Sequence, residues 1–228
     1  MCGRFTLVKE KKEVENRFDA QYNGDIFKKN YNASPSSLLP VITNENPQII
    51  QQFQWGLVPS WATDTQIAFK TINARKETIR EKPAFKHAYE NQRCLVIADS
   101  YYEWKKHGKS KIPYRITLKN DDLFAMAGIW ETWKAPDENV LYSFSIVTIP
   151  AIASISHIHD RMPVILSRIS EQSWLDSDIS GEKIYDSLIA PPASDIKFYT
   201  VSQKVNNASN NSADLITPQA HAIQGSLF

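Results

Sequence analysis

The chain has 228 residues, of which 42% are hydrophobic and 11% aromatic, so it can bury one sizeable core and we expect one domain. Its 26 Lys and Arg against 25 Asp and Glu give a net charge of +1. This balance argues against a globally basic nucleic-acid binder but allows a local basic groove. The two cysteines, Cys2 and Cys94, form no CxxC motif, which argues against a disulfide framework or a cysteine zinc site.

A charged run at residues 9–15 follows the opening residues directly, which is not the pattern of a signal peptide. No apolar run approaches the ~18–20 residues that a membrane span needs. His157 and His159 have no ligand set around them in the sequence, so no metal site is expected. We therefore expect a soluble, cytoplasmic, monomeric protein whose thiols stay reduced.

The first half of the chain alternates short strands with turns, and one helix is indicated by Val14 and Phe18, four residues apart among charges. In order, the patterns predict a strand at 4–8, a helix at 9–19, a loop at 24–37, a hairpin of strands 36–43 and 48–55 around a turn at 44–47, and an irregular aromatic loop at 55–61.

The second half contains more strands than helices. It predicts a helix at 83–89, strands at 93–98, 113–118, 123–130 and 141–148, short helices at 171–175 and 181–189, and a last strand at 198–201. The basic turn 105–111, with Lys105, Lys106, Lys109 and Lys111, is expected to be solvated. Since the strands do not alternate with helices, we predict an α+β fold with a mainly antiparallel sheet core and short flanking helices.

Cys2 stands next to a start methionine, which is normally removed when the following side chain is small. Removal of Met1 would leave Cys2 with an α-amine beside its thiol, and both groups are partly nucleophilic near neutral pH. An aldehyde condenses with such an amine to an imine, and the thiol then closes onto the imine carbon to give a thiazolidine. The alternative is an ordinary second residue in a mobile terminus.

Three polar residues stand at the ends of apolar segments, where rigid elements often carry sites. They are Asn73, Glu103 and His159. Taken singly, Asn73 could cap a turn, Glu103 could be a surface or salt-bridged residue, and His159 could be a structural histidine. Cys94 lies within an apolar strand and is predicted to belong to the core.

Eight short motifs occur in an order that resembles the SRAP family, the SOS response-associated peptidase proteins that act on abasic sites. They are Met1–Phe5, Tyr31–Pro35, Trp55–Trp61, Asn73–Thr78, Arg93–Leu95, Ala98–Asp99 with Tyr102–Trp104, His159–Pro163, and Val201–Ser202 with Val205–Asn207. Ile97 and Ser100 stand where the family usually has proline and glycine, and Ala62 stands where some members have a second tryptophan.

The resemblance implies a protein that binds single-stranded DNA and links covalently to the aldehyde of an abasic site, without a metal or organic cofactor. Cys2 matches the nucleophile, and Asn73 matches the residue that holds it. Glu103 matches the acid/base on the sugar. His159 matches the imidazole that assists imine formation and reversal. β-Elimination of the imine, an AP-lyase cut, would be a side reaction. The matched domain is taken as residues 1–212, with 213–228 as a partly disordered tail, and we expect nucleoid association at damage.

Five further residues lie in the matched motifs and are candidates for DNA contacts. Arg4, Arg75 and Arg161 are the candidates for binding phosphates. Trp61 and Trp104 are the candidates for stacking on bases or for wedging where a base is missing, with core packing as the alternative for both.

Two other functions stay open at the level of the sequence. The first is an N-terminal cysteine peptidase or amidohydrolase, in which Asn73 would be the oxyanion donor and cleavage after Met1 would expose Cys2. The second is a module that binds single strands without catalysis.

Overall fold

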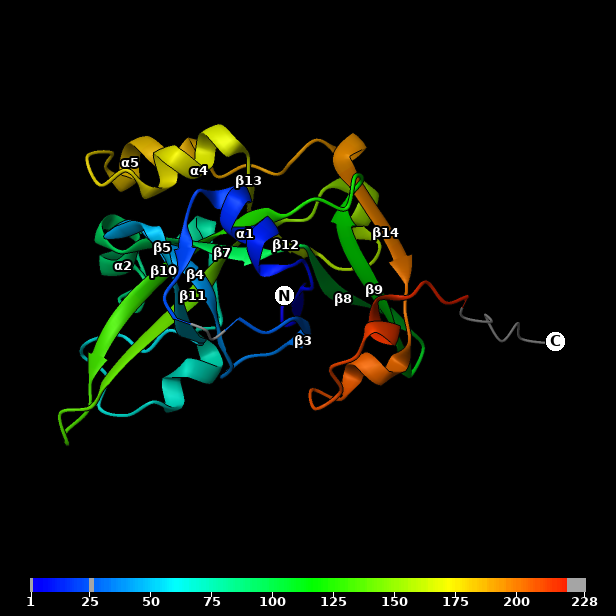
Figure 1. Cartoon of the computed structure of the whole chain (residues 1–228), viewed down its shortest axis with the longest axis horizontal. Helices are drawn as coiled ribbons and strands as arrows, with labels where there is room; N and C mark the ends of the chain where they lie inside the picture. Colours follow the sequence, from blue (N-terminus) through cyan, green and yellow to red (C-terminus); the bar gives the residue numbers. More distant parts are fainter. Residues whose placement is uncertain (1, 25–26, 221–228) are drawn as a thin grey trace.

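The computed structural model describes residues 2–24 and 27–220, which form two sheets with short helices around them (Figure 1). The larger sheet contains β2 (Gln21–Tyr22), β4 (Leu38–Thr43), β5 (Asn46–Trp55), β6 (Asn73–Arg75), β7 (Arg93–Ala98), β10 (Phe124–Lys134), β11 (Val140–Pro150), β12 (Arg161–Pro163) and β13 (Ile165–Leu166). The smaller sheet has the order β14-β9-β8-β1-β3. Its strands are β1 (Phe5–Leu7), β3 (Asn30–Ala33), β8 (Ser100–His107), β9 (Ser110–Leu118) and β14 (Ile196–Thr200).

The helices are short and pack around the two sheets, with α2 and α4 against the interior strands β7 and β10, and the α+β prediction is confirmed. The α-helices are α1 (Lys11–Phe18), α2 (Lys86–Asn91), α3 (Ala153–Ser156), α4 (Arg168–Leu175) and α5 (Gly181–Ile184). The 3-10 helices are η1 (Gln66–Lys70), η2 (Lys76–Thr78), η3 (Tyr185–Ser187), η4 (Ala193–Asp195), η5 (Gln203–Asn206) and η6 (Ala213–Ile216). Among the described residues, no helix is both long and apolar enough to cross a membrane.

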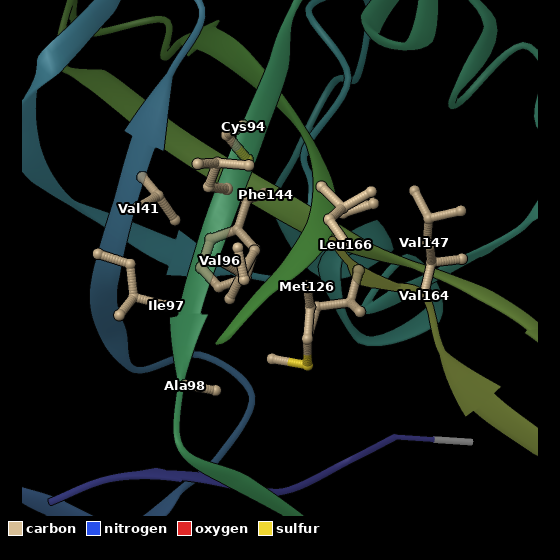
Figure 2. Close-up of a cluster of buried hydrophobic side chains, with 14 of the residues drawn as sticks. Val41, Cys94, Val96, Ile97, Ala98, Met126, Phe144, Val147, Val164 and Leu166 are labelled. Carbon is tan, nitrogen blue, oxygen red and sulfur yellow. The ribbon is translucent and has the colours of Figure 1, made fainter. Parts of the chain in front are cut away.

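The core of the larger sheet is centred on β7, in which every residue is buried (Figure 2). This explains its continuous apolar sequence, since a strand covered on both faces has no polar side. Cys94 is fully buried in this strand, as predicted. It lies opposite Gly128 of β10, where a Cβ would come within 2.8 Å of the Cys94 sulfur. The Trp174 indole then docks α4 on the pair by donating to the carbonyl of Cys94 at 2.9 Å.

β11 connects four strands of the larger sheet. It runs antiparallel to β10 and β12 and parallel to β5 and β6, which makes the sheet mixed rather than purely antiparallel. Because β6 and β12 both pair with the last third of β11, segments about 90 residues apart in sequence end at the same edge.

The hairpin of β8 and β9 is longer than the sequence predicted. The predicted basic turn 105–111 is wrong, because residues through His107 pair with residues from Ser110 onwards and only a tight connection remains at Gly108, with φ +57°. The protruding end of the hairpin is exposed on both faces, so its lysines hide the alternation that normally identifies a strand. The predicted loop 24–37 likewise contains β3.

The sequence assigned residues 213–228 to a tail. The first part of this segment, residues 213–220, contains η6 and packs on the smaller sheet. Leu215 is fully buried against Tyr102, Val201 and Val205. The Gln219 amide donates to the Thr200 carbonyl at 2.9 Å. The rest of the predicted tail, 221–228, lies outside the described residues.

Leu215→Ala should therefore lower the free energy of unfolding by about 2–5 kcal/mol, because it empties a closed apolar cluster. Ile169→Ala is the matched control, since that side chain is 80% exposed and its loss should cost within about 0.5 kcal/mol. Urea denaturation of both variants measures the difference. Equal midpoints would mean that the segment after residue 212 contributes nothing to the core.

Candidate functional site

Cys2 lies three residues before β1 and is fully buried, which places it in the interior rather than in a loose terminus. The Asn73 side-chain amide donates to the Cys2 carbonyl at 2.8 Å. Three residues later, the Phe5 ring packs on Trp55 with 5.2 Å between ring centroids. The backbone of residue 2 is therefore fixed from both the larger and the smaller sheet. Met1 lies outside the described residues.

Asp99 fixes the position of β1. One carboxylate oxygen accepts the Val8 amide at 2.5 Å, and the other accepts the Thr6 hydroxyl. The Asp99 amide donates to the Thr6 carbonyl at 2.9 Å, and the buried Arg115 side chain lies 3.4 Å from the same carboxylate. This set of contacts explains why a buried carboxylate ends the apolar strand β7: it is fully satisfied, as buried charges must be.

Arg4 was predicted to contact phosphate, but the structure gives one of its guanidinium nitrogens, Nη1, two protein partners. This nitrogen donates to the Asn32 side chain at 2.7 Å and to the Val205 carbonyl at 2.9 Å. The Asn32 amide in turn donates to the carbonyls of Asn207 and Asn210. Arg4 and Asn32 thus hold the η5 segment beside β1, so two of the sequence motifs serve to build the wall of the site.

β11 positions the other two candidate segments. Asn73 and Arg75 of β6 lie opposite Ile146 and Thr148, and Arg161 of β12 lies opposite Pro150. His159 stands two residues before β12, so β11 holds side by side the strand that carries Asn73 and the strand that follows the imidazole, and His159 lines the cavity beside β8.

Glu103 and His159 meet at this place. The Glu103 carboxyl is 2% exposed, and its Oε2 lies 3.9 Å from His159 Nε2. His159 Nδ1 accepts the Arg161 amide at 3.0 Å and lies 2.9 Å from an Asp160 oxygen. The ring is therefore held from its Nδ1 side while Nε2 faces the carboxyl. The structure brings Cys2, Asn73, Glu103 and His159 into one site.

Burial shifts the pKa values of these groups towards their neutral forms. It raises the pKa of Glu103 from its usual 4.5 to about 7, and it raises the pKa of the Cys2 thiol, with Glu103 acting in the same direction. Burial lowers the pKa of His159, and Lys106 lowers it further while Asp160 opposes the shift. A carboxyl that is half protonated at neutral pH can both give and take a proton, which is what general acid–base catalysis requires.

A cavity of about 430 Å³ opens above this pair and is lined by Glu103, Trp104, Lys106, Lys111, His159 and Asn206. The Trp104 indole donates to the Asn206 side chain at 2.7 Å, which fixes the ring at the wall. Lys106 and Lys111 face each other across the β8–β9 hairpin. Both lysines are exposed, as expected, but they belong to paired strands rather than to a turn and they line the cavity. If the sequence had been read as a longer hairpin, with residues paired symmetrically about Gly108, Lys106 and Lys111 would have been predicted to lie opposite each other.

The remaining DNA-contact candidates differ in how they are held. Arg161 makes a bidentate ion pair with Glu77 at 2.6 and 3.0 Å and also donates to the Thr148 carbonyl at 2.6 Å. Arg75 is exposed, and Trp61 is 59% exposed on the loop after β5. Within residues 2–24 and 27–220, no three His, Cys, Asp or Glu side chains are grouped as metal ligands would be.

The fold and the site define a class: a β-rich, single-domain protein whose buried second residue is a cysteine, set beside an amide, a carboxylate and an imidazole. The chain belongs to the SOS response associated peptidase (SRAP) family, whose model matches residues 1–208. This confirms the resemblance drawn from the eight sequence motifs.

Relatives and a solved structure agree with this assignment. The abasic site processing protein YoqW of Bacillus subtilis (strain 168) is 41% identical over 222 residues, which cover 95% of this chain and 99% of YoqW. The abasic site processing protein HMCES of Rattus norvegicus is 33% identical over an alignment that covers 82% of this chain and 64% of HMCES. A crystal structure of a protein from Bacteroides thetaiotaomicron superposes with a TM-score of 0.89 at 28% identity, covering 96% of this chain and all of that one.

The raised pKa of Glu103 predicts a pH-dependent stability that Glu103→Gln should remove. The folded state binds the proton more tightly than the unfolded chain, so the stability from this group is full below about pH 4.5 and is lost as pH rises through about 7. Between these pH limits, the free energy of unfolding of the wild type should fall by on the order of 2–3 kcal/mol relative to that of Glu103→Gln. Thermal melting of both proteins from pH 4.5 to 8 measures it. Glu138→Gln, at an exposed position, is the control and should follow the wild type. A constant difference between wild type and Glu103→Gln across the range would contradict the raised pKa.

Proposed function

We propose that this protein processes abasic sites in single-stranded DNA by forming a thiazolidine between Cys2 and the ring-opened sugar. The observation that carries the proposal is the burial of Cys2 beside Asn73, with Glu103 and His159 at 3.9 Å from each other next to it. YoqW and HMCES are both named abasic site processing proteins, which supports the same lesion as the substrate here. The proposal requires removal of Met1.

The reaction proceeds in two balanced steps. The Cys2 amine adds to the sugar aldehyde and, with loss of one water, gives an imine. The Cys2 sulfur then bonds to the imine carbon, the C=N electron pair moves to nitrogen, and the nitrogen takes up the proton that the thiol gives away. No oxidant or reductant enters, and both steps depend on proton transfer.

The surrounding side chains fit these steps. Asn73 holds the Cys2 backbone through its Nδ2, while its buried Oδ1 has no hydrogen-bond partner among the described residues. We expect this oxygen to accept a hydrogen from the Cys2 amine once Met1 is removed. Glu103, with a pKa of about 7, takes the proton from the amine and returns it to the leaving water. His159 assists with its Nε2 at the cavity side.

Imine formation also acidifies the neighbouring sugar carbon, so β-elimination competes with ring closure. Closure by the thiol removes the imine and suppresses strand cleavage. A protein without the thiol but with its amine should therefore cut the strand instead of trapping it. Cleavage between Met1 and Cys2 by the protein itself is the form of peptidase activity that the family name suggests and that this site could support.

Cys2→Ala should reduce the covalent adduct to background while leaving some strand cleavage. The Met1-free protein is mixed with a single-stranded oligonucleotide that carries one abasic site, and the products are run on a denaturing gel. Cys94→Ala is the matched control, because it removes the other thiol from a buried strand and should keep the adduct.

A Cys2-independent adduct would contradict the thiazolidine. The absence of any adduct, with loss of Met1 confirmed by mass spectrometry, would point instead to the amidohydrolase or to a module that only binds single strands.

The DNA backbone should pass over the lysine pair of the β8–β9 hairpin. Lys106 and Lys111 line the same cavity as Glu103 and His159, and neither has an ion-pair partner among the described residues. Arg161, by contrast, is already held by Glu77. Lysines near the reacting sugar attract its flanking phosphates, and exposed Trp61 offers a stacking face further along.

Replacing Lys106 and Lys111 together by Gln should weaken binding of an intact single strand and flatten its salt dependence. Each phosphate contact contributes about 0.7 to the slope of log affinity against log salt, so the pair should remove about 1.4. Fluorescence anisotropy over a sodium chloride series measures the slope. The Lys105→Gln, Lys109→Gln double variant removes the same charge outside the cavity lining. Equal slopes for the two double variants would show that the strand does not follow the lysine pair.

A further inference from the structure

The hydroxyl of Tyr101 is buried without a hydrogen-bond partner among the described residues. The side chain is fully buried, and no donor or acceptor of the described residues forms a hydrogen bond with its oxygen. Two other buried tyrosines are satisfied, since Tyr89 donates to the Gly181 carbonyl at 2.6 Å and Tyr102 to the Tyr31 carbonyl at 2.9 Å, whereas the buried Tyr22 hydroxyl also lacks a partner among the described residues. Because leaving a buried hydroxyl unpaired is unfavourable, a partner that arrives during function is the simplest reason for its retention.

Tyr101 lies at the reactive end of the site. Tyr101 and Glu103 are two residues apart on β8, so their side chains point to the same face of the strand. Tyr101 also lies opposite Phe5 of β1 and belongs to the same buried cluster as Cys2. Burial raises the pKa of Tyr101 well above its usual value, and the Cys2 thiol and the Glu103 carboxylate raise it further. The phenol thus keeps its hydrogen and can only be a donor to a negative neighbour.

Among the described residues, no side chain donates a hydrogen bond to the Cys2 sulfur in the resting site. The sulfur lies 3.9 Å from the Arg4 carbonyl oxygen. A hydrogen bond with the Arg4 backbone lowers the pKa of the thiol, but burial outweighs it and raises that pKa. When the sulfur loses its proton to attack the imine, it becomes an anion in a low-dielectric interior, and an anion there requires a hydrogen-bond donor.

We propose that Tyr101 is a positioning residue whose hydroxyl donates to the Cys2 sulfur as the thiol ionises, which stabilises the thiolate and aims it at the imine carbon. The inference rests on the proposed function for its catalytic use, but the proposed hydrogen bond depends only on ionisation of the Cys2 thiol and can be tested without DNA. The hydroxyl is not needed for the strand to fold, because the aromatic ring of Tyr101 alone fills its place in the buried cluster.

Tyr101→Phe keeps the ring and removes only the hydroxyl. The Met1-free protein is treated with iodoacetamide over a range of pH without DNA, and alkylation of Cys2 is followed in the N-terminal peptide by mass spectrometry, which separates it from Cys94. The midpoint of the rate profile should move up by about one pH unit, so that alkylation below the midpoint becomes ~10-fold slower. The adduct with abasic single-stranded DNA should also form more slowly.

Tyr22→Phe is the matched control. The Tyr22 hydroxyl is also buried without a hydrogen-bond partner among the described residues, but burial and Glu15, not Cys2, raise its pKa. Its loss should leave the Cys2 profile unchanged. Should Tyr101→Phe fail to fold, as judged by thermal melting, 3-fluorotyrosine at position 101 is a second variant. Its more acidic hydroxyl is a stronger donor and should move the midpoint down.

The outcomes separate the two proposals. An unchanged Cys2 profile in Tyr101→Phe, or in the fluorinated protein if only that folds, overturns the role of Tyr101, whether or not the wild type forms an adduct. A shifted profile in a protein that forms no adduct upholds the contact and overturns the proposed function. A shift of equal size in Tyr22→Phe would assign the effect to general packing and overturn the role of Tyr101.

Discussion

The pairing of β1 with β8 is the constraint on which the site depends. A second residue is ordinarily the most mobile part of a chain, yet Cys2 is fully buried because the nearby residues Phe5–Leu7 are held as a strand. Asp99 supplies the key contacts, since its carboxylate binds the Thr6 hydroxyl and the Val8 amide and is itself satisfied by Arg115. Loss of these contacts would release the nucleophile from the groups that act on it.

Burial has two opposed effects on the proposed chemistry. It brings the pKa of Glu103 to about 7, which suits a group that must both accept and donate a proton. It also raises the pKa of the Cys2 thiol, which suppresses the thiolate that ring closure needs. A buried hydrogen-bond donor near the sulfur, for which Tyr101 is our candidate, would lower the pKa of the Cys2 thiol again. A cation that lines the cavity, such as Lys106, would act in the same direction. Neither would remove the effect of burial on the pKa of Glu103.

Convergence at the end of β11 could not be deduced from local sequence patterns. Apolar runs and turn residues predicted the strand-rich class, the buried strand 93–98 and the core position of Cys94. They do not specify that β6 and β12 flank one strand, because pairing between distant segments is decided by packing. The family motifs supplied that information for Asn73 and His159, which the structure then places at one site.

Other features escaped the sequence for identifiable reasons. The sequence around the β8–β9 hairpin was interpreted as a turn because it is rich in lysine. At an exposed strand end, charged residues occupy both faces and hide the alternation that identifies a strand. The segment after residue 212 was expected to be a partly disordered tail, but the buried Leu215 packs its described part, residues 213–220, against the smaller sheet. Arg4 carried the expected charge, yet Asn32 and the Val205 carbonyl give its Nη1 a structural role that residue type alone does not reveal.

The most direct measurement is to alkylate the purified adduct between the Met1-free protein and abasic single-stranded DNA under denaturing conditions, and then to digest it and weigh the N-terminal peptide. A thiazolidine engages both the amine and the sulfur of Cys2, so the account predicts a peptide that carries the sugar remnant and takes up no alkyl group. A peptide that carries the sugar remnant and is also alkylated on sulfur would show a link through the amine alone and would contradict the account.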